Sequence, residues 1–313
     1  LAAQIWLDAQ DIKFWVGLIE DLGASAVWGS QQLGLFAGAQ RDGLFGIWYG
    51  KAPGVDRTGD VFKHAHAAGT SALGGVLAVL GDDHMCKSST LPSQSEFAMQ
   101  DAEIPVLSPA SIQDVLDYGL HGWAMSRFSG GWSAMIALAD TMDSGAVVDV
   151  SLDRMNFVRP DFEFPEDGVH MRRSDPPLEK ERRLRDYKLP AAQAWVRANS
   201  LDRVILPSAK PRVGLIVSGQ AARDVFEALA ALGLSPDEAA KLGVSIYKVA
   251  MPWPLEQEGI RAFCAGLERV LVIEHKRPLI EDQLRAALYP LPEKKRPLLE
   301  GKRTVDGLPL LSQ

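Results

Sequence analysis

Residues 46–96, GIWYGKAPGVDRTGDVFKHAHAAGTSALGGVLAVLGDDHMCKSSTLPSQSE, decide the fold that we expect for this chain. Residues 75–80 are an apolar run, as expected for a parallel strand that is buried on both faces. Two polar runs, residues 50–58 and 81–94, lie on either side of it and are interpreted as loops. Parallel sheets place ligands on loops at the carboxyl ends of their strands. The stretch therefore predicts an α/β fold with a ligand site at these loops.

Strands and helices alternate through the first 200 residues, which predicts a mostly parallel sheet covered on both faces. We expect strands over residues 44–49, 75–80, 104–107 and 147–152, and helices over 21–35, 60–68, 93–101 and after Ser111. Residues 159–185 are rich in proline and charge without periodicity, which indicates an extended linker. A helix is expected over residues 189–199.

A second α/β unit begins at Arg212. The runs VGLIVS, VSIYKV and RVLVIE are strand-like, and each precedes a helical pattern, over residues 221–232, 255–266 and 279–288. Three such repeats predict a second compact three-layer domain. Residues 293–313 are charged and contain proline and glycine, so we expect a tail that leads to another part of the protein.

Composition restricts the classes of function. A chain of 313 residues with 47% hydrophobic residues is long enough for two domains with real cores. The net charge of −7 without a basic stripe argues against a nucleic-acid partner, and no apolar run is long enough to span a membrane. No secretory signal opens the chain, and Cys86 and Cys264 form no CxxC motif, so we expect a cytoplasmic protein without a disulfide framework or cluster ligands.

The sequence of residues 46–96 resembles that of the indolepyruvate:ferredoxin oxidoreductases. The resemblance includes VWGSQQLGLF before this stretch and IPVLSPASIQDVLDYGLHGWAMSRFSG after it. This family is a branch of the thiamine-diphosphate-dependent 2-oxoacid:ferredoxin oxidoreductases. The resemblance implies an aminopyrimidine-binding domain over residues 1–200, with a linker near 159–188, and a transketolase-C-terminal-like domain over 205–292. No GDG motif with a distal Asn is present, so residues 293–313 are expected to lead to a missing diphosphate-binding domain. Together with Leu1 at the start, this indicates a fragment.

Glu20 is the residue that the resemblance implies for catalysis and cofactor binding. In that family a glutamate at the start of the helix leading to AVWG contacts N1′ of the aminopyrimidine, and GLIEDLGASAVWG puts Glu20 there. A carboxyl group at N1′ favours the imino tautomer, which removes the C2 proton of the thiazolium. From the residues alone, Glu20 is instead an acid that stabilises a helix terminus. Asp21 is an adjacent competitor, and Ile19 stands where a polar residue is expected.

The two polar runs supply the other candidate residues. By resemblance, residues 50–58 lie near the cofactor, where Pro53, Gly54 and Val55 bind it and Lys51 or Arg57 meets the substrate carboxylate; the alternative is a solvated turn. Related oxidoreductases carry an Asp-Asp…Ser-Ser…Gln pattern like that of residues 81–94. We expect His84 to act in catalysis and these residues to contact substrate: Asp82, Asp83, Lys87, Ser88, Ser89 and Gln94. Ser93 stands where a histidine is expected, which leaves the proton-transfer residue open.

Other reactive side chains have simpler interpretations. His64 and His66 are two apart on a helix, so they point in opposite directions and cannot share an ion; we expect no metal site here. Cys86 beside His84 is weak evidence for a nucleophile. His275 ends the third strand of the second unit, where that sheet would place a ligand.

The resemblance implies part of an oxidoreductase that decarboxylates an aryl pyruvate of the indolepyruvate type to an acyl-CoA. It also implies thiamine diphosphate and Mg²⁺ shared with the missing domain, iron–sulfur clusters elsewhere in the enzyme, coenzyme A, ferredoxin as electron acceptor, and a homodimer. We expect the fragment to be inactive alone. Two alternatives remain: a non-catalytic assembly domain of the same fold, and a metal-dependent hydrolase that uses the loop over residues 81–94.

Overall fold

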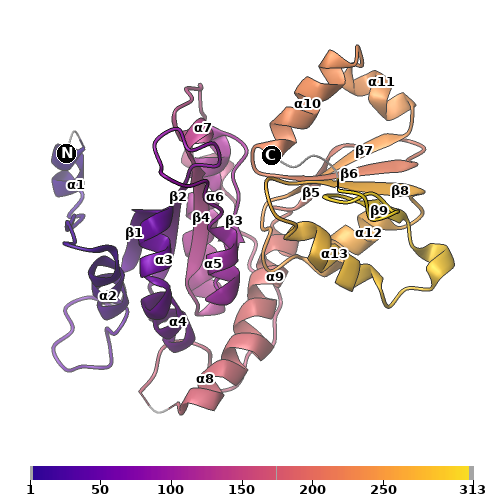
Figure 1. Cartoon of the computed structure of the whole chain (residues 1–313). Coiled ribbons are helices and arrows are strands. Elements are labelled where there is room, and N and C mark those ends of the chain that lie inside the picture. Colours follow the sequence, from indigo (N-terminus) through magenta and orange to yellow (C-terminus); the bar gives the residue numbers. More distant parts are fainter. Residues whose placement is uncertain (1–2, 174, 310–313) are drawn as a thin grey trace.

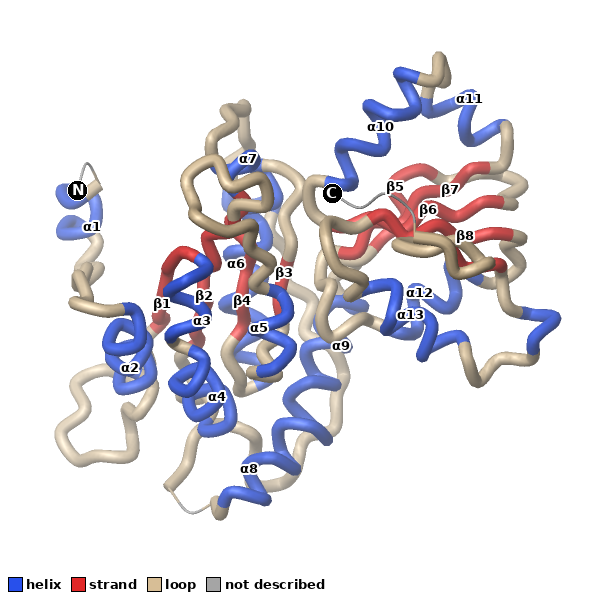
Figure 2. The backbone as a smooth tube through the Cα atoms, in the orientation of Figure 1, coloured by secondary structure: helices blue, strands red, loops and turns tan. Residues whose placement is uncertain are grey.

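The computed structural model describes residues 3–173 and 175–309 and contains two sheets, each covered by helices (Figures 1 and 2). The α/β fold class that the sequence predicts is confirmed. The first sheet has the order β1-β2-β4-β3, and all its pairings are parallel. Its strands are β1 Phe45–Lys51, β2 Gly75–Asp82, β3 Val106–Leu107 and β4 Ser133–Leu138.

Strand β2 is buried on both sides because helices cover both faces of the first sheet. Val76, Ala78 and Leu80 belong to a core with residues of α2, α3, α4 and α5, whereas Leu77 belongs to a second core with α6 and α9. This alternation follows from the two-residue period of a strand. The helices of this unit are α1 Gln4–Ala9, α2 Glu20–Ser30, α3 Ala52–Arg57, α4 Gly59–Ala68, α5 Glu96–Asp101, α6 Ile112–Ser129 and α7 Ala139–Met142.

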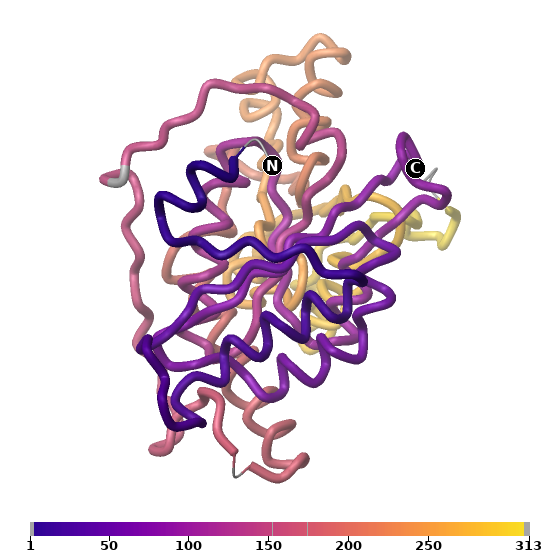
Figure 3. The backbone as a smooth tube through the Cα atoms, turned by 90° about the vertical axis from the view of Figure 1, so that its left-hand side faces the viewer, coloured from indigo at the N-terminus to yellow at the C-terminus, as the bar shows by residue number. Residues whose placement is uncertain are grey.

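A long extended stretch follows α7 and runs along one side of the first unit (Figure 3). The linker predicted from its charge and prolines is only partly correct, because its second half is helical. Helix α8 Pro177–Arg183, a π-helical turn Leu184–Lys188 and α9 Leu189–Ala198 follow one another without a break. The charges of this region neutralise one another: Arg183 bonds Asp175 at 2.8 Å and also pairs with Asp167.

The second sheet has the order β5-β7-β6-β8-β9, in which only the pairing of β5 with β7 is antiparallel. Figure 1 shows α10 and α11 on one face and α12 and α13 on the other, so the predicted three-layer unit is confirmed. Its elements are β5 Arg203–Leu206, β6 Val213–Ser218, α10 Ala221–Ala231, α11 Pro236–Lys241, β7 Val244–Val249, α12 Gln257–Cys264, β8 Arg269–Ile273, α13 Ile280–Leu288 and β9 Leu298–Glu300, with a short 3₁₀ turn at Glu293–Lys295. Another 3₁₀ turn, Leu152–Arg154, lies in the stretch after α7.

Several expectations about local structure were wrong. Residues 50–58 are not a loop, because Gly50 and Lys51 end β1 and the rest is mostly helix α3. Residues 147–152 form no strand. Val147 is fully exposed, and the stretch has no β-ladder partner among the described residues. Strand β4 was missed, and the expected tail contributes β9 to the second sheet. Residues 310–313 of that tail lie outside the described residues.

The two units meet along the edge of the first sheet. The N–H groups of Val106 and Ser108 donate to the carbonyl oxygens of Trp253 and Ala250, each at 2.8 Å. These bonds continue β3 into the segment after β7. The carboxyl ends of β2, β4, β6 and β8 therefore lie near one junction.

Candidate functional site

Glu20 is held at a corner formed by α2, α3 and β1. Its carboxylate Oε2 lies 3.4 Å from Nη1 of Arg57, and its backbone carbonyl accepts a hydrogen bond of 3.0 Å from Nε1 of Trp48. A Cβ atom at Gly54 would lie 2.4 Å from Cγ of Glu20, so only glycine at this position permits the observed contact. The Glu20 side chain is 37% exposed and can therefore meet a ligand.

Three of the four residues predicted to bind the cofactor present atoms at this corner. Glu20 contacts Gly54, and Pro53 is exposed in the first turn of α3. The side chain of Val55 is completely buried in the core, so its side chain is not available to a ligand. Burial of Val55 and the hydrogen bond of 2.7 Å from the Thr58 hydroxyl to the Gly54 carbonyl hold this short segment as a helix.

The two polar runs do meet in space. Nζ of Lys51, at the end of β1, lies 3.2 Å from Oγ of Ser88 and also bonds the Ser88 carbonyl. Register explains the meeting, because Lys51 pairs with Gly81 in the parallel ladder between β1 and β2. The ends of the two runs thus lie at the same edge of the sheet, whereas their contact with a substrate stays a prediction.

Asp82 and Asp83 organise the loop that follows β2. Both oxygens of Asp82 accept hydrogen bonds from Ser95, at 2.8 Å from its N–H and 2.6 Å from its hydroxyl. Asp83 accepts from the N–H groups of Ser88 at 2.7 Å and Lys87 at 2.9 Å, and these bonds lower the pKa of Asp83. Burial acts in the opposite direction on Asp82 and raises its pKa. The loop is therefore shaped by its own carboxylates.

The remaining loop residues point to different partners. The ammonium group of Lys87 bonds Asp140 at the start of α7. Gln94 reaches the second unit, where its Oε1 accepts from the N–H and Nε of Arg277, each at 3.2 Å. Ser89 stays near Asp83. The residues predicted to contact substrate are thus spread between Lys51 and the junction, and they do not line a single pocket.

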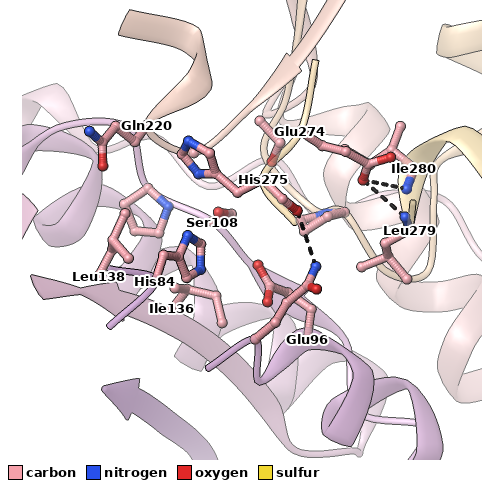
Figure 4. A pocket seen from close by; sticks show the side chains of 15 residues that line it. His84, Glu96, Ser108, Ile136, Leu138, Gln220, Glu274, His275, Leu279 and Ile280 are labelled. Atoms are coloured by element: carbon pink, nitrogen blue, oxygen red, sulfur yellow. Dashed lines mark hydrogen bonds between the residues drawn. The ribbon is translucent and has the colours of Figure 1, made fainter. Parts of the chain in front are cut away.

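His84 lies in a cavity at the junction of the two units (Figure 4). Its ring meets that of His275 edge to face, with centroids 5.1 Å apart. The wall from the first unit includes His84, Glu96 and Ser108, and the wall from the second includes Gly219, Gln220 and His275. Burial, followed by the charges of His275 and Lys276, lowers the pKa of His84 to about 4, so its ring is neutral at pH 7.

One carboxyl group of this cavity, on Glu96, is buried, and a second, on Glu274, is half-buried. Burial and the neighbouring Asp82 raise the pKa of Glu96 to about 8. Burial also raises the pKa of Glu274, although this carboxylate accepts from the N–H groups of Leu279 at 3.0 Å and Ile280 at 2.8 Å (Figure 4). Sequence analysis missed Glu96, because an acid in the first turn of a short helix is typical of a solvated helix end.

The two histidines of α4 lie in different surroundings. His66 is buried, and its Nδ1 accepts a hydrogen bond of 2.9 Å from the N–H of Trp132. Burial lowers the pKa of His66 to about 3. His64 is exposed and lies 3.6 Å from Asp60.

Among the described residues, no helix is both long and apolar enough to cross a membrane.

Comparisons with known proteins agree with the resemblance. Residues 203–310 match the family model of the indolepyruvate oxidoreductase domain. Indolepyruvate oxidoreductase subunit IorA of Pyrococcus horikoshii is 26% identical over 68% of this chain and 32% of its own length. The subunit of the same name from Methanothermobacter thermautotrophicus is 26% identical over 80% of this chain and 38% of its own length. The chain thus spans about a third of the curated relatives that it matches.

Solved structures share the fold. A 2-oxoglutarate:ferredoxin oxidoreductase from Magnetococcus marinus, with 2-oxoglutarate, coenzyme A and succinyl-CoA bound, gives a TM-score of 0.61 at 16% identity. The similarity covers 97% of this chain and 56% of that one. An inactive tetramer of a split-gene transketolase gives a TM-score of 0.52 at 11% identity, over 93% of this chain and 74% of that one.

Proposed function

From the premise that this chain is a relative of the indolepyruvate:ferredoxin oxidoreductases, we propose that it forms the aminopyrimidine-binding and transketolase-C-terminal-like part of a 2-oxoacid:ferredoxin oxidoreductase. Residues 1–200 are the first of these domains and residues 205–292 the second. The complete enzyme oxidatively decarboxylates an aryl pyruvate to an acyl-CoA and passes the electrons to ferredoxin.

The position of Glu20 carries this proposal. Its carboxyl group is partly exposed at the start of α2, and its ion pair with Arg57 is long, at 3.4 Å. Exposed pairs of this kind contribute at most about 1 kcal/mol, so a ligand can replace it. Cγ of Glu20 occupies the space that a Cβ at Gly54 would need, and this close contact fixes the direction of the Glu20 carboxyl group. These features fit the aminopyrimidine of thiamine diphosphate.

When bound, thiamine diphosphate supplies the carbanion chemistry that breaks the bond between the carboxylate and the carbonyl carbon of the 2-oxoacid. This chain contributes Glu20, which shares a proton with a ring nitrogen of the cofactor, and backbone of α3 around Pro53 and Gly54, which orients the ring. Lys51 is the cation of this edge, where it attracts the carboxylate of the substrate. The diphosphate and Mg²⁺ are held by a part of the enzyme outside this sequence.

Two further features support an assembly larger than this chain. Strand β1 is an edge strand, and its Phe45, Ile47 and Tyr49 are each about half exposed, at 53%, 49% and 58%. Apolar side chains in such a row favour a protein interface, which the proposed homodimer provides. Iron–sulfur clusters are ligated by several cysteines, and the sequence has two, of which Cys264 is buried. The clusters are therefore proposed to lie elsewhere in the enzyme.

The test is an anaerobic assay of the full-length protein with thiamine diphosphate, Mg²⁺, coenzyme A and ferredoxin. We expect ferredoxin to be reduced only when a 2-oxoacid is added, and indolepyruvate or phenylpyruvate to be oxidised faster than a branched-chain 2-oxoacid. Faster oxidation of the branched-chain acid would revise the substrate and leave the reaction class standing. No reduction with any 2-oxoacid, in protein shown to be folded, would favour a non-catalytic assembly domain.

A further inference from the structure

Asp82, His84 and Glu96 form a cluster that the proposed chemistry of Glu20 does not use. One ligand atom from each of the three lies within 4.8 Å of the other two. Asp82 ends β2, His84 follows it in the loop, and Glu96 begins α5. The three come together because the loop between β2 and α5 returns across the end of its own strand, where Asp82 binds Ser95.

Three polar atoms of this cluster, on His84 and Glu96, have no hydrogen-bond partner among the described residues. These atoms are Nδ1 and Nε2 of His84 and Oε2 of Glu96, and all three are buried. Glu96 is only 9% exposed. The guanidinium group of Arg277 stacks on Phe97 and donates to Gln94. Unsatisfied buried groups are unfavourable and require an explanation.

The charges also call for a cation. Asp82 and Glu96 are two buried carboxyl groups, and one oxygen of each lies within 4.8 Å of the other, so their negative charges repel one another. A divalent ion between them would reverse this repulsion, and a neutral imidazole would complete the set of ligands. Ser95 already orients Asp82 with two hydrogen bonds, which is the outer-shell support that carboxylate ligands usually have.

The site has room for an ion. The cavity beside His84 and Glu96 has a volume of about 30 Å³. A single water needs roughly 10–15 Å³ of such space, so this space is large enough for an ion with one or two waters.

We propose that Asp82, His84 and Glu96 bind one divalent transition-metal ion at the junction of the two units. One nitrogen and two carboxylate ligands suit Zn²⁺, whose bonds to such atoms are about 2.0–2.2 Å long. Ligands at this length stand about 3.5 Å apart in tetrahedral geometry, so a small rotation of His84 and Glu96 closes the site. The ion is structural: it ties the loop after β2 to α5, beside the His84–His275 contact between the units.

The experiment uses the full-length protein, stripped with a chelator and titrated with Zn²⁺ alone. After loosely bound metal is removed, elemental mass spectrometry counts the zinc. This measurement distinguishes zinc from the iron and magnesium of other sites. We expect the wild type to retain one equivalent more than His84→Gln and Glu96→Gln. Loss of one of three ligands should weaken Zn²⁺ binding by about 100-fold or more, since outer-shell partners alone contribute about 10- to 100-fold.

His64→Gln is the matched control, because His64 is an exposed histidine outside the cluster. It should retain the zinc of the wild type, and Zn²⁺ should raise the melting temperature of the wild type and this control but not of the two cluster variants. Glu96→Gln keeps the size of a buried side chain and so preserves the fold if His84→Gln does not. Equal zinc content in the wild type and in a folded Glu96→Gln variant would overturn the proposal.

Discussion

Asp114 and Lys248 form a buried ion pair across the junction of the two units, with Oδ2 and Nζ 2.5 Å apart. Asp114 lies in the first turn of α6 and Lys248 on β7, and their side chains are 13% and 6% exposed. Asp114 also accepts a hydrogen bond of 2.9 Å from the N–H of Ala110. The pair therefore fixes the orientation of one sheet against the other.

Lys248→Met should destabilise the protein strongly. It leaves the Asp114 carboxylate buried with one hydrogen bond fewer, and loss of one partner of a buried pair costs about 3–5 kcal/mol. Denaturant unfolding measures this loss. The exposed pair of Arg212 and Glu268, at 2.8 Å, is the control, and Arg212→Met should change the stability little because water screens the pair. Similar losses in the two variants would contradict a special role for the buried pair.

Glu20→Gln should remove most turnover without changing the fold. Gln keeps the size of Glu but cannot share a proton with a ring nitrogen, and loss of such a group lowers the rate by a factor of about 10² to 10⁴. A glutamate that acts only on the helix terminus contributes about 0.3–1 kcal/mol of stability. Steady-state turnover and melting temperature of the full-length enzyme separate the two roles. Asp21→Asn is the neighbouring control, and a large loss there with Glu20→Gln active would transfer the role to Asp21.

Gly54→Ala should impair catalysis through Glu20. The added Cβ would stand 2.4 Å from Cγ of Glu20, so the Glu20 side chain must rotate away. Alanine favours a helix by about 1 kcal/mol over glycine, so stability should not fall together with activity. Gly59→Ala is the matched control, because a Cβ there meets nothing within 4 Å. Equal kcat values for the two variants, measured at saturating thiamine diphosphate, would show that Gly54 does not position Glu20.

Lys188 should make stability rise with pH above neutrality. Burial lowers its pKa from 10.5 to about 7, and its Nζ bonds the carbonyl oxygens of Ala67 at 3.3 Å and His66 at 3.5 Å. Between pH 7 and 10.5 the unfolded chain binds more protons at Lys188 than the folded one, so raising the pH favours the folded state, by at most about 1.4 kcal/mol per unit. Lys188→Met should flatten melting temperature against pH in this window, and an unchanged slope would contradict a neutral buried lysine.

The periodicity of the sequence predicts β2, α4 and the three strand–helix repeats of the second unit, because burial on a sheet or one helix face determines the pattern of apolar residues. Strand β4 escaped prediction, since a short apolar run after a long helix does not reveal its own conformation. Helix α3 depends on the burial of Val55, and β9 on pairing with β8. Residues 147–152 have the composition of a strand but no partner, so they form none.

The sequence by itself determined the resemblance to the indolepyruvate:ferredoxin oxidoreductases, the alternation of strands and helices, and Glu20 as the candidate acid, because these depend on residues close together in the chain or on a shared motif. Only the tertiary structure decided that Asp83 closes a loop while Glu96 joins Asp82 and His84 in a buried cluster. Burial and the absence of a partner arise from contacts between distant segments. Those contacts, rather than the residue type, determine the pKa of a carboxyl group and whether it is available to bind an ion.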